Sequence, residues 1–165
     1  MDPSKIDELT LRTLAFFAGH PAQVQHFAKV HHFAALLARL EKLPENERFI
    51  TEAAAIVHDV GILPAREKYG ASSGPLQEQE GPPIAEKLLS ELAFPPEVIE
   101  RVSFLVGHHH TYTAIDGLDY QILVEADFLV NFHEGATPKE KIAHTVEKLF
   151  RTPSGAALAR TMFDL

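Results

Sequence analysis

The chain of 165 residues has a formal net charge of −8, contains 45% hydrophobic residues and lacks cysteine. This length suits one domain with one core, and the lack of cysteine excludes disulfides, thiolate metal ligands and a cysteine nucleophile. The negative charge argues against binding to nucleic acid polymers or to anionic membranes. No segment is long and apolar enough to cross a bilayer and no signal peptide pattern opens the chain, so we expect a cytoplasmic protein.

Apolar residues recur at helical spacing along the chain, which predicts an all-α bundle of seven to nine helices. We expect a single domain over residues 1–165, with a motif-bearing core at about 20–134 and C-terminal helices over 137–165. In the N-terminal half, helices are expected over residues 5–18, 21–43, 45–58 and 65–69, followed by a polar Gly/Ser loop over 70–75.

Prolines and capping side chains mark the helix starts in the second half of the chain. Proline is tolerated in the first turn of a helix and not further in, and Asp or Thr often caps the N-terminus. By these signals, helices are expected to begin at Pro82-Pro83, at Pro95-Pro96, after Asp119 and, near the C-terminus, after Thr137 and Thr152.

His58 and Asp59 stand side by side at the end of the apolar run 53–57. An ionised carboxylate that is taken out of water costs several kcal/mol, roughly, unless it is paired or bound to a metal. This pair therefore needs a compensating partner from elsewhere in the chain.

Two further polar side chains are expected to point inward. At about 100° per residue, His26 falls at the centre of the apolar stripe of its helix, whereas His31 and His32 are rotated away from that stripe. Asp127 lies on a helix that is apolar around its whole circumference, which is typical of a central helix. Glu125, about 160° from Asp127 on the same helix, is expected to be an independent and partly exposed group.

The run His108-His109-His110 follows an inward apolar stripe that His109 continues most closely. Histidines at a helix C-terminus are often only solvated, and the helix dipole favours their cationic form. We expect at least one of the three to be functional, with His109 first, His108 second and His110 third.

Each of these polar residues taken alone is explained most simply as a structural group. Taken together, they supply two imidazoles and two carboxylates, all predicted to point inward, from three different helices. Such a set forms a metal site inside a helical bundle, and mixed nitrogen and oxygen ligands suit Mn, Fe, Co, Ni or Zn. The four residues are His26, His58, Asp59 and Asp127.

In this order and helix context, His26, the segment 54–61 with its His58-Asp59 pair, and Ala126-Asp127 resemble the HD domain. HD domains are helical metal-dependent phosphohydrolases, and the resemblance covers about residues 20–134. It implies that His26, His58, Asp59 and Asp127 are the ligands of a divalent metal.

In dinuclear members of this family, extra histidines between the His-Asp pair and the last Asp hold a second metal. The resemblance implies His108 and His109 for that role here. This chain has no histidine in the segment 77–81, so Glu78 or Glu80 is expected to supply an oxygen ligand instead.

Substrate contacts are also expected to depart from the family pattern. A Lys often follows His-Asp-x-Gly in the family, but Ile62 stands there in this chain. Arg66 and Lys68 are therefore expected to neutralise the substrate phosphate, while Gln77 and Glu80 order the rim of the site.

The expected function is hydrolysis of a phosphate ester or anhydride, in a nucleotide or a related small phosphorylated metabolite. One or two divalent metals serve the reaction, and Asp59, His108 and His109 are the expected catalytic groups. Two alternatives stay open: a di-iron oxygenase with the HD fold, which needs a fuller dinuclear ligand set, and a non-catalytic metal-bound module that senses a nucleotide or binds a partner protein. The sequence makes no prediction of oligomeric state.

Overall fold

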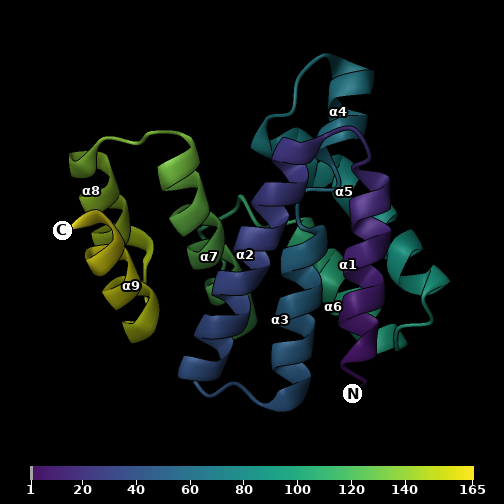
Figure 1. The fold of residues 1–165 in the computed structure, drawn as a ribbon, viewed down its shortest axis with the longest axis horizontal. Coiled ribbons are helices and arrows are strands. Elements are labelled where there is room, and N and C mark those ends of the chain that lie inside the picture. Colours follow the sequence, from purple (N-terminus) through teal and green to yellow (C-terminus); the bar gives the residue numbers. More distant parts are fainter. Residues whose placement is uncertain (1) are drawn as a thin grey trace.

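The computed structural model describes residues 2–165, in which helices are joined by turns and loops and no strand occurs (Figure 1). The predicted all-α bundle is confirmed for this part of the chain. The nine helices of the described residues are α1 (Ser4–Phe16), α2 (Pro21–Leu40), α3 (Glu45–Val57), α4 (Ile62–Tyr69), α5 (Gly74–Glu91), α6 (Pro96–Val106), α7 (Leu118–Glu134), α8 (Lys139–Leu149) and α9 (Pro153–Phe163). None of these described helices is long and apolar enough to cross a membrane.

Helices α2, α3 and α7 pack against one another at the centre of the molecule (Figure 1). The side chains of α7 are buried on nearly every face, as its uniformly apolar sequence predicts. On α3, the small residues 53–55 are fully buried and let the neighbouring helices approach closely. One hydrophobic cluster extends from Ile6 of α1 to Ala159 of α9.

Helices α8 and α9 form the end of the molecule that lies away from α1 (Figure 1), and a carboxylate joins them to α7. Glu125 of α7 is 0% exposed. It accepts hydrogen bonds from the Gln121 side chain, from the backbone N–H groups of Arg151 and Thr152, and from the Thr152 hydroxyl. The expectation of a partly exposed Glu125 is wrong, because the face of α7 turned away from Asp127 is covered by the start of α9.

Helix α5 begins eight residues before the expected start, so the prediction that Pro82-Pro83 open a helix is wrong. Prolines inside a helix remove backbone hydrogen bonds, and contacts made by the first turns of α5 offset this loss. Glu78 accepts hydrogen bonds from the backbone N–H of His110 at 3.0 Å and from the Thr111 hydroxyl at 2.9 Å. Helix α4 also begins earlier than expected, at Ile62.

Glycines allow the backbone of α5 to lie directly against its neighbours. A Cβ atom on Gly61 would lie 2.5 Å from the carbonyl oxygen of Gln77, and one on Gly81 would lie 2.7 Å from Val106 Cγ1. A Cβ on Gly74 would lie 3.0 Å from Cβ of His110. The start of α5 is therefore held between the residues that follow His58-Asp59 and the turn after α6.

The helix caps expected at Asp119 and Thr137 are absent from the described residues. No side-chain hydrogen bond caps α7 or α8, so the capping roles expected of Asp119 and Thr137 are wrong. Asp119 lies in the first turn of α7 and pairs with Arg101 at 2.7 Å. Helix α9 starts at Thr152-Pro153 as predicted, and the Thr152 hydroxyl caps it by accepting a hydrogen bond from the backbone N–H of Gly155 at 3.0 Å.

Candidate metal centre

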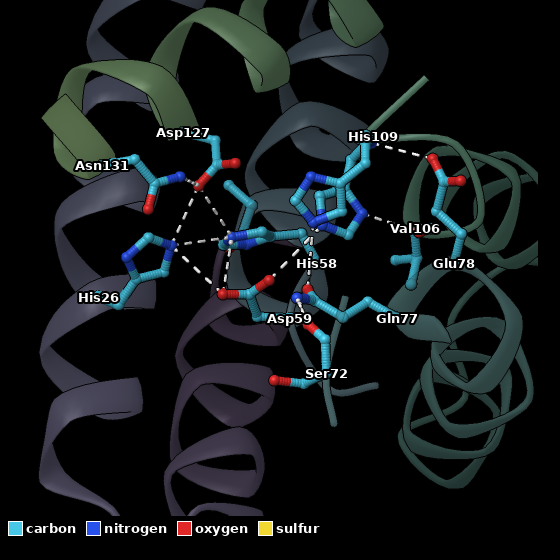
Figure 2. A network of polar contacts seen from close by, with 12 residues as sticks. His26, His58, Asp59, Ser72, Gln77, Glu78, Val106, His109, Asp127 and Asn131 are labelled. Atoms are coloured by element: carbon cyan, nitrogen blue, oxygen red, sulfur yellow. Dashed lines mark hydrogen bonds and ion pairs between the residues drawn. The ribbon is translucent and has the colours of Figure 1, made fainter. Parts of the chain in front are cut away.

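The structure brings His26, His58, Asp59 and Asp127 together between the three central helices (Figure 2). His26 comes from α2 and Asp127 from α7, while His58-Asp59 directly follow α3. His26 Nε2 lies 3.1 Å from Asp127 Oδ1 and 3.3 Å from Asp59 Oδ2. His58 Nε2 lies 3.5 Å from each of the same two oxygens. His31 and His32 stay outside this group, as their helical angle predicts.

The Nδ1 atoms of both histidines are engaged with acceptors. His58 Nδ1 lies 2.8 Å from the carbonyl oxygen of Ala55, and His26 Nδ1 lies 2.8 Å from Oε2 of Glu134. Neither acceptor carries a proton, so each Nδ1 donates one, and Nε2 of the neutral ring presents a lone pair. The two Nε2 atoms lie 3.2 Å apart and face two carboxylates, an arrangement compatible with a divalent metal.

The charges in this group shift the pKa values of its members. Burial lowers the pKa of His26, but Asp127, Asp59 and Glu134 outweigh burial and raise it to about 9. The pKa of His58 is raised as well, since the two aspartates again outweigh burial. Burial raises the pKa values of both aspartates, and the histidines bring them below their usual range. Without a cation, a proton on His26 therefore offsets part of the negative charge.

A second group of metal-binding side chains shares Asp59. Asp59, His109 and His110 each offer a donor atom, all within 4.8 Å of one another. His109 is 1% exposed, donates from Nδ1 to the carbonyl oxygen of Val106 at 2.8 Å, and has no hydrogen-bond partner at Nε2. That nitrogen lies 3.5 Å from Oδ1 of Asp59. Because Oδ2 of the same carboxylate faces His26, Asp59 lies between the two groups (Figure 2).

His110 lies in this second group, and the structure does not bring His108 there. His108 Nδ1 lies 2.7 Å from the carbonyl oxygen of Phe104, and its ring stacks on the Phe104 ring at a centroid distance of 4.2 Å. Helix α6 ends at Val106. The expected order of His108 before His110 assumed that helical angles continue to residues 108–110. Because the helix has already ended, these angles do not apply there and the order is reversed. Burial lowers the pKa of His110 to about 4, so its ring is neutral.

The two glutamates that were expected to contribute oxygen ligands lie outside both groups. Glu78 accepts hydrogen bonds from the backbone N–H of His110 and from the Thr111 hydroxyl, and it lies on the far side of His109 from Asp59 (Figure 2). Glu80 pairs with Lys68 at 3.1 Å and accepts a hydrogen bond from the Tyr69 hydroxyl at 2.8 Å. These carboxylates stabilise the local structure around α5.

A pocket of about 230 Å³ opens onto the centre. Of the four residues expected at the substrate site, only Gln77 lines this pocket. Arg66 donates a hydrogen bond to the Ser72 hydroxyl at 3.1 Å, and Lys68 pairs with Glu80. None of the described residues that line it is Lys or Arg. The lining residues are Ala22, Gln23, His26, Asp59, Ile62, Gln77, His110, Asp127, Asn131 and Glu134.

Two polar residues of α7 support the centre and were missed in the sequence. Asn131 donates to Oδ1 of Asp127 at 2.8 Å. Glu134 orients His26 and pairs with Lys29 at 2.6 Å. Burial raises the pKa of Glu134, but Lys29 and His26 outweigh burial and hold this pKa below its usual range. Asn131 and Glu134 follow Asp127 by four and seven residues, so this i, i+4, i+7 spacing on one helix face was the available signal.

The fold and the centre define an all-helical protein with a buried His/Asp cluster that is compatible with a divalent metal. Residues 24–147 match the model of the HD domain family. The chain belongs to this family, which lies within the superfamily of metal-dependent phosphohydrolases. The match extends into α8, beyond the motif-bearing core expected at 20–134. Searches of curated proteins and of solved structures found no significant match.

Proposed function

We propose that this protein hydrolyses a phosphate ester or anhydride, in a nucleotide or a related small phosphorylated metabolite, with the help of one or two divalent metals. The observation that carries the proposal is the convergence of imidazole nitrogens and carboxylate oxygens at the wall of an open pocket. His109 Nε2 is buried and unpartnered, and His26 Nε2 and His58 Nε2 face carboxylates at 3.1–3.5 Å. This arrangement supplies the ligands of a metal and leaves a side open to substrate.

Each residue of the centre has a role in this proposal. His26, His58, Asp59 and Asp127 would hold one metal, and Asp59, His109 and His110 would hold a second. When bound, the metal supplies a water of lowered pKa as the nucleophile and polarises a phosphoryl oxygen. Glu134 and the carbonyl of Ala55 keep the imidazoles of His26 and His58 in the orientation that presents Nε2. The proposal assigns Asp59 and His109 as ligands and gives His108 no proton-transfer role.

The pocket favours a substrate whose phosphate charge is met by metal. Its lining carries the carboxylates of Asp59, Asp127 and Glu134, together with the amides of Gln23 and Asn131. The amides can bind hydroxyl or ring-nitrogen groups of a substrate. Arg66 and Lys68 do not line the pocket. In this proposal they therefore contact phosphate only if part of the substrate extends out of the pocket.

Metal analysis combined with a hydrolysis assay tests this function. The protein is purified without chelator, its bound metals are measured, and phosphate release is followed over a panel of nucleotides, dinucleotides and sugar phosphates. We expect bound transition metal, phosphate release from at least one substrate class, and loss of that release on chelation with recovery on metal addition. A metal-loaded protein that is inert toward the whole panel would contradict the proposal.

A di-iron oxygenase is a second candidate, because two groups of donors share the carboxylate of Asp59. An oxygenase of this kind needs ligands for two metals, and the two groups that share Asp59 offer them. Iron at two per chain, with the electron paramagnetic resonance of a mixed-valence pair and no phosphate release, would favour the oxygenase over the hydrolase.

Metal affinity is expected to rise with pH up to about pH 9. The pKa of His26 is raised to about 9, so below that value a metal must displace the proton from His26, and above it the ring is already free. The apparent affinity for Mn²⁺ should therefore rise by up to about tenfold per pH unit for each proton displaced. Competition titration against a chelator across the neutral and alkaline range measures this slope. His31→Ala, on the same helix but outside the centre, should keep the slope, whereas a slope of zero in the unaltered protein would contradict the prediction.

A further inference from the structure

The side-chain amide of Gln77 has a fixed orientation beside the second group of donors. Its Nε2 donates to the backbone carbonyl oxygen of Ser72 at 2.7 Å. A carbonyl oxygen only accepts, so the amide nitrogen must face Ser72. Oε1 is thereby directed to the other side, toward His110 and the pocket. Gln77 is only 9% exposed, which restricts the side chain to this position.

The spacing between Gln77 Oε1 and its neighbour matches that of two metal ligands. Oε1 lies 3.2 Å from Nε2 of His110, the same separation as between the Nε2 atoms of His26 and His58. Neighbouring ligands of an octahedral metal with bonds of about 2.1 Å lie about 3.0 Å apart. Without a cation this contact is a hydrogen bond from His110. With a cation beside both atoms, the neutral ring carries its proton on Nδ1, and Nε2 and Oε1 each present a lone pair.

The unpartnered nitrogen of His109 indicates where that cation would lie. His109 Nε2 is fully buried without a hydrogen-bond partner, faces Asp59 Oδ1 at 3.5 Å, and belongs to a ring whose centroid lies 4.0 Å from that of His110. Figure 2 shows Gln77 and His109 on the same side of Asp59, with Gln77 directed toward the histidine rings. A buried lone pair without a donor is costly, and a cation would satisfy it.

We propose that the amide oxygen of Gln77 is a ligand of the second metal, completing the set formed by Asp59, His109 and His110. The inference rests on the proposed function only in placing a second metal in this group. The set contains two imidazoles and two oxygens, and an uncharged carbonyl oxygen is a hard ligand. The second site is therefore expected to favour Mn²⁺ over Zn²⁺ more strongly than the same site would with an imidazole in place of the Gln77 amide.

Co²⁺ titration of the full chain tests this ligand, because the visible absorption of Co²⁺ reports its ligands without any substrate. The unaltered protein should bind two equivalents. Gln77→Leu should weaken the second equivalent on the order of 10- to 100-fold and leave the first unchanged. Gln77→His should keep the second equivalent, shift its absorption because nitrogen replaces oxygen, and raise its preference for Zn²⁺ over Mn²⁺ in competition titrations. Gln79→Leu, an exposed neighbour on the same helix, should behave as the unaltered protein.

Three results would overturn the proposal: a single equivalent bound by the unaltered protein, an unchanged second equivalent in Gln77→Leu, or an unchanged spectrum in Gln77→His. Circular dichroism checks that each variant is folded, and Gln77→His decides if Gln77→Leu does not fold. Two metals with a Gln77-dependent spectrum but no phosphate release would contradict the proposed function and support Gln77 as a ligand.

Discussion

Asp59→Ala is expected to lose both divalent metals and at least about 10³-fold of the phosphate-releasing activity. Asp59 places one oxygen 3.3 Å from His26 Nε2 and the other 3.5 Å from His109 Nε2, so one substitution removes a ligand from each group. A catalytic metal contributes several kcal/mol to transition-state stabilisation, and about 1.4 kcal/mol corresponds to tenfold in rate. Metal content by mass spectrometry and phosphate release at saturating substrate measure the two effects.

Variants of residues that belong to one group only provide the comparison for Asp59. Asp127→Ala should lose the metal bound by His26 and His58 and keep the other, whereas His109→Ala should do the reverse. Asp7→Ala, on the exposed surface of α1, should change neither metal content nor activity. If Asp59→Ala kept one full equivalent of metal, Asp59 would not be shared between the two groups.

Glu125→Ala is expected to lower the free energy of unfolding by about 3–5 kcal/mol. The substitution leaves the donors of Gln121, Arg151 and Thr152 without their buried acceptor, and each unsatisfied buried group costs about 1–3 kcal/mol. Some of these donors are met by water, which limits the total. For a chain of this size, the loss corresponds to a Tm lower by roughly 6–20 °C. Urea and thermal unfolding followed by circular dichroism measure both quantities.

The control for Glu125 is Glu147→Ala, an exposed glutamate on α8, for which we expect a change within about 0.5 kcal/mol. Below its unfolding transition, Glu125→Ala should still bind metal, since Glu125 contacts none of the donors of the centre. An unfolding midpoint equal to that of the unaltered protein would show that this carboxylate does not stabilise the attachment of α9 to α7.

The part of the site that lies within regular helices could be predicted from the sequence. His26 falls on the apolar stripe of α2, which the period of 3.6 residues directs inward. Asp127 lies on a helix that is apolar around its whole circumference, which predicts burial on most faces. His58-Asp59 follow a fully buried run on α3. Since α2, α3 and α7 are the central helices, inward-facing polar groups on them meet, as the structure shows.

Other features depended on packing between elements and could not be found from one helix at a time. His110 takes its position from a turn after α6, where helical angles no longer apply. Glu125 is buried because the start of α9 covers it, which the sequence of α7 alone does not indicate. Helix α5 continues through Pro82-Pro83 because its first turns are held by residues 110–111, far away in the chain. These differences arise from long-range contacts that outweigh local preference.

The two groups of donors in the centre are positioned in different ways, and Gly61 determines the position of the group that contains Gln77. His26 and Asp127 belong to tightly packed central helices and the buried His58 directly follows one, so the core sets their geometry. Gln77, in contrast, is brought to the centre by backbone lying on backbone, at a point where Gly61 has no room for even one methyl group. A methyl group at position 61 would therefore push the start of α5 away and move Gln77 from His110, so the placement of Gln77 depends on a residue that carries no donor atom of its own.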